Sequence, residues 1–228
     1  AKEILPKLRR SQLALTVIKA GKTDAQILEM AKTNPDTLNV EELMYAASIV
    51  DNADDVIAFT EANAKQNPAD WRTNNNLAAV EFEKGQFDKT KAALDAASNN
   101  GGAEQAETNF NYALLAMLEG NTTDAAAFLG KAAGVEQLAE AQALLNIQNG
   151  EYAKAIENFG NTVSNNAALA QLLSGNIDKA ASILDNVADK NADTYYLSAI
   201  CAARQDNLAK VCESLKAVAG ICKTKAAG

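Results

Sequence analysis

The sequence predicts an all-α protein in which about seven helical hairpins stack in a single array. Two observations lead to this fold class. The 228 residues include only 12 glycines and 3 prolines, so few residues interrupt helices. A short turn phrase also recurs along the chain, each time between two segments with the apolar periodicity of a helix. One hairpin of short helices cannot bury its own apolar face, so neighbouring hairpins must stack.

The turn phrase has four clear copies and three weaker ones. The clear copies are GQFDKT, GNTTDA, GEYAKA and GNIDKA, which begin at Gly85, Gly120, Gly150 and Gly175. The weaker ones begin at Gly21, Asp51 and Asp206. Hairpin turns are therefore expected near residues 21, 51, 85, 120, 150, 175 and 206. A helix that reverses tightly often ends in a residue with a positive φ, which glycine adopts without steric cost and aspartate tolerates better than most.

Apolar residues follow each clear turn at fixed distances. The residue nine positions after the glycine is Leu94, Leu129, Phe159 or Leu184, and three positions further come Ala97, Ala132, Thr162 and Val187. Apolar-periodic segments such as 75–82 and 110–118 precede the turns. We therefore expect these positions to form the core.

The positions of two prolines and the length of one repeat predict where helices end and where the array is irregular. Pro35 and Pro68 fall where the second helix of a hairpin should end, and segments 34–37 and 67–70 offer capping side chains for the next helix. Gly150 and Gly175 are only 25 residues apart. We expect shortened helices and a local irregularity there.

Residues 71–97 resemble the tetratricopeptide repeat. Leu77 and Ala78 stand at the Leu-Gly pair of that family, Phe82 near its tyrosine, Gly85 at its turn, and the later consensus positions hold Phe87, Leu94 and Ala97. Thr90 departs from the family's alanine, and the glycine of the Leu-Gly pair is replaced by Ala78, Ala113, Ala143 and Ala168. The resemblance covers nearly the whole chain and implies one right-handed superhelical solenoid over residues 1–228. More loosely, segments 69–72 and 195–199 resemble such repeats in cell-envelope proteins of the Bacteroidota.

Composition excludes many functions. The chain has no histidine, which removes the commonest general base and transition-metal ligand. With 21 basic and 29 acidic residues its net charge is −8, and its one tight basic cluster is Lys7, Arg9 and Arg10, so nucleic acid is not an expected partner. Neither a phosphate-binding loop nor a calcium loop occurs. The sequence therefore predicts a non-enzymatic protein without a cofactor or metal.

Three cysteines lie in or beyond the last expected hairpin. Cys201 and Cys212 fall on its two antiparallel helices, so a disulfide between them is geometrically possible. Cys222 could instead pair with Cys212, and buried free thiols are the other alternative. A zinc site is not expected because there is no fourth cysteine.

The resemblance also implies a binding surface. In tetratricopeptide arrays the second, fifth, ninth and thirteenth positions of each first helix contact the ligand. Here these are Arg72, Asn75, Ala79 and Glu83, then Glu107, Phe110, Leu114 and Leu118, then Gln137, Glu140, Leu144 and Gln148. An apolar middle set between polar or acidic sets is typical of a groove for a peptide or helix. The alternative is that Phe110, Leu114 and Leu118 belong to the core.

These observations predict a protein-interaction scaffold that binds a partner peptide or helix. Capture of a partner's carboxylate terminus is not expected, because Arg72 is the only basic residue among the twelve positions. The alternative function is an assembly segment of a longer cell-envelope protein whose groove is filled by its own other domains. The first residue is not Met, and residues 223–228 contain no recognisable capping helix, which both favour a fragment or a processed chain.

The expected location follows from the looser resemblance. It implies a bacterial periplasm or cell envelope, with the cytoplasm as the alternative. No apolar run reaches the roughly 18 residues that a membrane-spanning helix needs. Membrane association is therefore expected only through a domain outside this chain.

Overall fold

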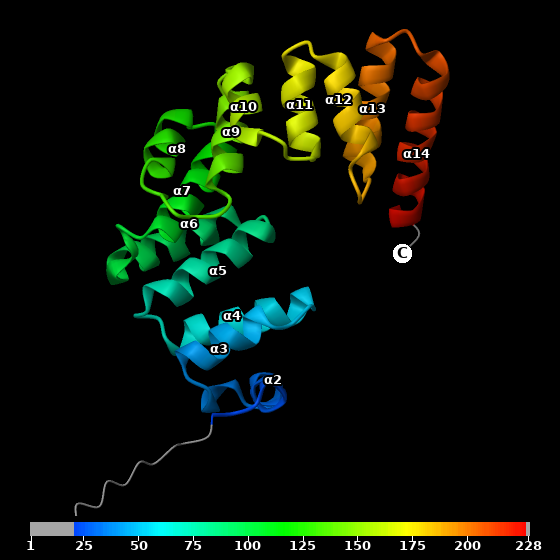
Figure 1. Ribbon diagram of the computed structural model, residues 1–228. Helices are drawn as coiled ribbons and strands as arrows, with labels where there is room; N and C mark the ends of the chain where they lie inside the picture. Colours follow the sequence, from blue (N-terminus) through cyan, green and yellow to red (C-terminus); the bar gives the residue numbers. More distant parts are fainter. Residues whose placement is uncertain (1–20, 227–228) are drawn as a thin grey trace, which may run out of the picture. The chain divides into compact units, whose positions relative to one another are not determined.

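The structure is a computed structural model that describes the backbone of residues 21–226 and the side chains of residues 21–220. All regular structure in this part of the chain is helical, with thirteen α-helices (Figure 1). The predicted all-α helical-repeat solenoid is confirmed. The first helix of the hairpin expected at residue 21 and the basic cluster of Lys7, Arg9 and Arg10 lie outside the described residues. The chain divides into two compact units, residues 1–63 and 64–228, which are described separately.

The first unit contains α2 (Asp24–Thr33), the 3₁₀ turn η1 (Pro35–Thr37), α3 (Val40–Ser48) and most of α4 (Ala53–Gln66). Its core is formed by Ile27, Leu38, Leu43, Ala46 and Phe59 with neighbouring side chains. The Asn63 amide donates a hydrogen bond to the Val40 carbonyl at 3.0 Å, which ties the end of α4 to the start of α3.

Capping in the first unit differs from expectation in one respect. Segment 34–37 was expected to cap the next helix, but Pro35 begins a 3₁₀ turn that uses this segment. The N-cap of α3 is instead Asn39, whose side chain accepts from the Glu42 backbone while Glu42 bonds back to the Asn39 backbone. This reciprocal pair satisfies two N–H groups that the helix start leaves free.

The second unit is a row of hairpins, each made of a first and a second helix. They are α5 (Trp71–Glu83) with α6 (Phe87–Ala97), α7 (Ala106–Leu118) with α8 (Thr122–Leu129), α9 (Leu138–Gln148) with α10 (Tyr152–Phe159), α11 (Asn165–Leu173) with α12 (Ile177–Asp185), and α13 (Ala192–Arg204) with α14 (Leu208–Ala226). Each second helix up to α12 packs on the first helix of the next hairpin. First helices also contact each other directly in the pairs α5–α7, α7–α9 and α11–α13.

The five turns of this unit share one geometry. Gly85, Gly120, Gly150 and Gly175 have φ between 70° and 84°, and Asp206 has φ 56°. At every turn the N–H after this residue bonds to a carbonyl five residues back, as from Gln86 to Glu81 at 2.8 Å and from Asn207 to Ala202 at 2.9 Å. This Schellman arrangement satisfies carbonyls that the first helix would otherwise leave unpaired.

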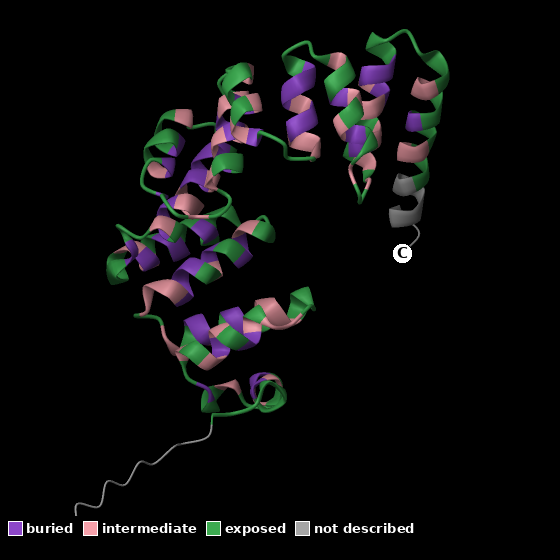
Figure 2. Cartoon of the chain, in the orientation of Figure 1, coloured by how far each residue is buried: buried purple, intermediate pink, exposed green. Residues whose placement is uncertain are grey.

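The core lies between the helices of neighbouring hairpins (Figure 2). The alanines at the position of the family's glycine, which are Ala78, Ala113, Ala143 and Ala168, are all fully buried or nearly so. Leu94, Leu129, Phe159 and Leu184 are at most 4% exposed, as the repeat pattern predicts. Small side chains let the paired helices approach closely, and the large ones fill the space between hairpins.

The irregularity predicted from the short repeat is present between α10 and α11. These helices have 8 and 9 residues, and Gly160 ends α10 with φ 54°. The α9–α11 contact is weaker than the contacts of the other neighbouring first helices. Asn161, Thr162 and Val163 in this connection are exposed, so Thr162 is not the core residue that the repeat pattern predicts.

The Gly101–Gly102 connection between α6 and α7 is sterically constrained. Residues Ser98–Gly102 follow α6 as a short π turn that is kinked by the non-helical backbone of Asn100 and Gly101, with Gly101 at φ 99°. A Cβ at Gly102 would lie 2.7 Å from the Ala97 carbonyl oxygen and 3.0 Å from the Thr108 hydroxyl. Only glycine fits this close approach of α7 to the end of α6.

Gly120→Ala should lower the free energy of unfolding by about 1–2 kcal/mol, because an alanine at φ 75° brings its Cβ against the following carbonyl. Space is not the cause, since nothing lies within 4 Å of the added atom. Gly220→Ala is the matched control: Gly220 is an exposed helical glycine without a positive φ, so this change should stabilise by about 1 kcal/mol. Urea unfolding followed by circular dichroism measures both, and shifts of the same sign would contradict the role of the turn.

Candidate functional site

Most of the sequence-predicted binding positions lie along the first helices α5, α7 and α9, and we call these positions the first-helix face. Its exposed members are Ala79, Glu83, Glu107, Leu118, Gln137, Glu140 and Gln148. Leu118, the last residue of α7, is 51% exposed, which is unusual for a leucine in a packed helix. Arg72, Phe110, Leu114 and Leu144 are half-buried.

The apolar residues of this face serve two purposes. Phe110, Leu114 and Leu144 pack against the core cluster of Ala113, Met117, Ala141 and neighbouring residues, while part of each side chain still faces solvent. Leu118 does not belong to that cluster. Of the three residues for which the sequence left core and groove open, Phe110 and Leu114 pack against the core with part of their surface open to solvent, and Leu118 is an exposed surface residue.

A hollow of about 100 Å³ opens between α5, α6 and α7. It is lined by Ala78, Ala79, Phe82, Glu83, Thr90, Asn111 and Leu114. Most of this lining is apolar, with the Glu83 carboxylate and the Asn111 amide as polar groups. Such a hollow has room for one aliphatic side chain and offers a charge and an amide beside it.

Asn75 is buried, in contrast to its expected place among the ligand contacts. It is 6% exposed, and its side-chain oxygen accepts a hydrogen bond from the Asn111 amide at 3.0 Å. Asn75 thus links α5 to α7. Gln148 makes a second link, because its side-chain amide donates to the Met117 carbonyl at 3.1 Å and ties the end of α9 to the end of α7.

The charge of the first-helix face is acidic. Arg72, the single basic residue, donates to both carboxylate oxygens of Asp70 at 3.0 and 2.6 Å, so its charge is locally neutralised. These hydrogen bonds hold the pKa of Asp70 below its usual value. Glu83, Glu107 and Glu140 are exposed and in none of the ion pairs found among the described side chains. The field at this face therefore favours a basic segment.

Tyr112 fixes the position of α7 within the array. Its ring stacks on Phe128 of α8, with centroids 5.0 Å apart, and its hydroxyl donates to Asp95 of α6 at 2.7 Å. Burial raises the pKa of Tyr112 to about 12, with the Asp95 carboxylate adding to the shift and a hydrogen bond from Ser98 opposing it. The hydroxyl is therefore a donor throughout the physiological pH range.

Sequence reasoning missed one residue that lines the hollow and two exposed apolar residues on the later first helices α11 and α13. Asn111 lines the hollow, yet it lies one position beyond the fifth position of its helix. Leu173 and Tyr196, which are 44% and 56% exposed, occupy on α11 and α13 the positions of Leu118 and Phe110. The signal for Leu173 and Tyr196 was the same spacing, counted from the turns at residues 175 and 206.

The two cysteines whose side chains are described are not joined in a disulfide. Cys201 is buried and Cys212 is exposed, and both are free thiols. Burial raises the pKa of the Cys201 thiol, which keeps it protonated and unreactive at neutral pH. The side chain of Cys222 lies outside the described residues, so a pairing with Cys212 stays a prediction.

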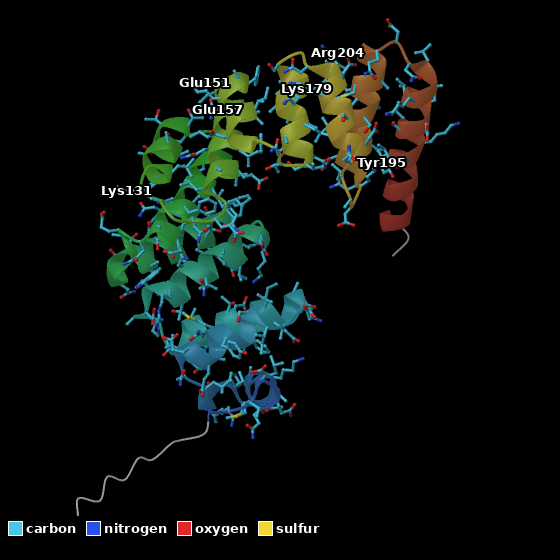
Figure 3. The ribbon with its side chains drawn as sticks, in the orientation of Figure 1. Lys131, Glu151, Glu157, Lys179, Tyr195 and Arg204 are labelled. Atoms are coloured by element: carbon cyan, nitrogen blue, oxygen red, sulfur yellow. The ribbon has the colours of Figure 1, made fainter. Side chains whose placement is uncertain are left out.

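A second, more polar hollow of about 360 Å³ lies in the last hairpin. It is lined by Asp185, Lys190, Tyr195, Ser198, Lys210, Glu213, Ser214 and Ala217; Tyr195 is labelled in Figure 3. Its two lysines already bind within the protein: Lys190 donates to the carbonyls of Leu184 and Asp185, and Lys210 pairs with the Asp185 carboxylate. Lys190 thus closes the loop between α12 and α13, and Lys210 links α14 to the end of α12, so both lysines have structural roles.

Neither a metal-ion cluster nor a membrane-spanning helix is found in the part of the chain that the structure describes. No group of three or more Cys, Asp or Glu side chains there is arranged to hold a metal ion. No described helix is both long and apolar enough to span a bilayer.

Solved structures match this fold. A tetratricopeptide repeat protein from Parabacteroides merdae superposes with a TM-score of 0.61 at 16% sequence identity, covering 87% of this chain and 85% of its own. PilF from Pseudomonas aeruginosa superposes with a TM-score of 0.55 at 15% identity, covering 82% of this chain and 90% of its own. No protein-family model and no curated protein matches the sequence. The chain therefore has the tetratricopeptide-repeat fold, as the residues of segment 71–97 indicate.

Tyr112→Phe should lower the free energy of unfolding by about 1 kcal/mol at pH 8, through loss of the hydrogen bond to Asp95. Because the folded pKa is raised above the unfolded value of about 10, this advantage of the wild type is complete below pH 10 and is lost as the pH rises towards 12. Urea unfolding of both proteins at pH 8 and pH 11 measures the change. An equal difference at the two pH values would show that Tyr112 is not held in its neutral form.

Proposed function

We propose that this protein is a non-enzymatic interaction scaffold whose first-helix face binds a segment of a partner protein. The observation that carries the proposal is the hollow between α5 and α7, which lies among the exposed residues Ala79 and Glu83 and the half-buried Leu114. An apolar hollow with a few polar groups at its rim is the usual form of a site that anchors one side chain.

The partner segment is an apolar residue flanked by basic ones. The apolar residue enters the hollow, where Leu114 and Phe82 surround it. Exposed Leu118 extends the apolar contact along α7, and Glu83 and Glu140 offer carboxylates on the neighbouring helices. Electrostatic attraction at such a rim contributes more to association rate and selectivity than to affinity.

The rigidity of the face supports this role. α5, α7 and α9 are linked by the hydrogen bonds of Asn111 and Gln148, and α7 is further held by Tyr112. A partner segment therefore meets a surface that is already ordered, which reduces the entropic cost of binding. The tetratricopeptide-repeat fold supports the same class of function, since arrays of stacked hairpins present extended binding surfaces.

Leu118→Asp should abolish capture of partner segments selected from a displayed peptide library on the wild-type protein, because it places a charge in the apolar contact. Leu173→Asp is the matched control, since Leu173 is the last residue of α11 as Leu118 is of α7 and is similarly exposed. Circular dichroism should show that both variants stay helical. Equal binding by the two variants would show that Leu118 does not contact the partner. Unfolding of Leu118→Asp would show that Leu118 belongs to the core. Either result would place the function elsewhere.

Ala79→Leu should fill the hollow and weaken binding of the same segments by tenfold or more, about 1.4 kcal/mol, without loss of helix.

The double variant Glu83→Gln with Glu140→Gln should instead slow association and reduce its dependence on salt concentration. Stopped-flow binding at low and high salt separates the two effects. Selected segments without basic residues, or rates that ignore salt, would contradict the charge assignment.

A further inference from the structure

The last helix, α14, carries a second apolar stripe that faces away from its own hairpin. Leu208, Cys212, Leu215 and Ala219 recur at steps of four, three and four residues, which places them on one side of the helix. All four are exposed, Leu208 to 75% and Leu215 to 46%. We call these four residues the outer stripe. The other side of α14, with Ser214 only 5% exposed, packs in the hairpin with α13.

The other hairpins show how the residue equivalent to Leu215 is buried. Leu215 lies nine residues after the turn residue Asp206, as Leu94, Leu129, Phe159 and Leu184 do after their turns. Those four are between 0 and 4% exposed, against 46% for Leu215.

In each of those four cases a residue from the first helix of the next hairpin belongs to the same core cluster. The pairs within one core cluster are Leu94 with Leu115, Leu129 with Leu145, Phe159 with Ala170, and Leu184 with Cys201. In the described part of the chain no helix covers Leu215 in this way. The element that fits the outer stripe is therefore a helix that presents small and aliphatic side chains.

Charge at the edge of the outer stripe indicates which kind of helix fits. The residue after Leu94 is Asp95, which accepts a hydrogen bond from Tyr112 on the next first helix at 2.7 Å. The same position on α14 holds Lys216, which is exposed. An ammonium group that reaches the neighbouring helix requires an acidic or acceptor side chain there. A second copy of α14 would bring another Lys216 to the contact, while its exposed carboxylate, Glu213, lies further round the helix, where it lines the hollow with Lys190 and Lys210; this disfavours self-association.

We propose that the outer stripe of α14 docks an amphipathic helix of another protein, whose apolar side is made of alanine and leucine and is bordered by acidic residues. The docked helix takes the place that a following first helix takes on α6, α8, α10 and α12. Leu215 and Leu208 enter its apolar side, and Lys216 pairs with a carboxylate at its border. This surface is separate from the first-helix face, and the opposite charge preference distinguishes the two.

The test uses two synthetic helical peptides of about 20 residues, long enough for appreciable helicity. Both carry Ala and Leu four residues apart, the relation of Ala141 to Leu145, and they differ only in having Glu or Lys at the border. Fluorescence anisotropy measures their binding to the full chain and to the variants Leu215→Asp, Leu208→Ser, Lys216→Glu and Leu118→Asp. Circular dichroism checks the fold of each variant, and Leu208→Ser provides a milder change should Leu215→Asp unfold.

The Glu-bordered peptide should bind the wild type and Leu118→Asp equally, and should bind Leu215→Asp and Leu208→Ser about tenfold or more weakly. Lys216→Glu should reverse the preference, so that the Lys-bordered peptide binds better. The proposal is overturned if neither peptide binds the wild type, if Leu118→Asp alone loses binding, or if the preference does not reverse. A wild-type dimer in sedimentation equilibrium that Leu215→Asp dissociates would equally overturn it in favour of a second copy. None of these results bears on Leu118 and partner capture at the first-helix face.

Discussion

Chain reversal through one residue of positive φ is the constraint on which the second unit depends. When a helix ends this way, its last carbonyls accept hydrogen bonds from the N–H groups of the turn, and the next helix starts within three residues. Two helices joined so tightly must lie antiparallel and close together, which is why the contact positions are alanines such as Ala78 and Ala143. The turn therefore sets both the geometry of the hairpin and the size of the side chains within it.

Small contact residues leave each hairpin with too little apolar burial to be stable alone, so stability comes from stacking on neighbours. The first helices α5, α7 and α9 are then held in a row by side-chain hydrogen bonds, and the Tyr112 contacts hold α7 on α6 and α8. The hollow beside Ala79 arises in this row, between a small residue on α5 and the larger Leu114 on α7. The proposed binding site therefore arises from packing between hairpins and is not formed by any single helix.

Features that repeat along the chain could be predicted from the sequence. The turns at Gly85 to Asp206 and the buried Leu94, Leu129, Phe159 and Leu184 were visible because the same physical requirement recurs in every hairpin. Features that depend on a contact with one particular residue of a neighbouring hairpin could not be predicted from the sequence. The burial of Asn75 follows from a single hydrogen bond with Asn111, and the π turn before Gly102 follows from the close approach of Thr108. No spacing in the sequence encodes such contacts between neighbouring hairpins, and the handedness of the superhelix and the continuity of one array over residues 1–228 stay predictions.

The central claim is that the second unit is held together by coupling between adjacent hairpins. Native-state hydrogen exchange at increasing denaturant, resolved for each helix from α5 to α14, tests it most directly. Coupling between neighbours predicts that α13 and α14 open at a lower free energy than α7 and α9, because among the described helices α14 packs chiefly on α13. One common opening free energy for all ten helices would show a single cooperative core and would contradict the claim.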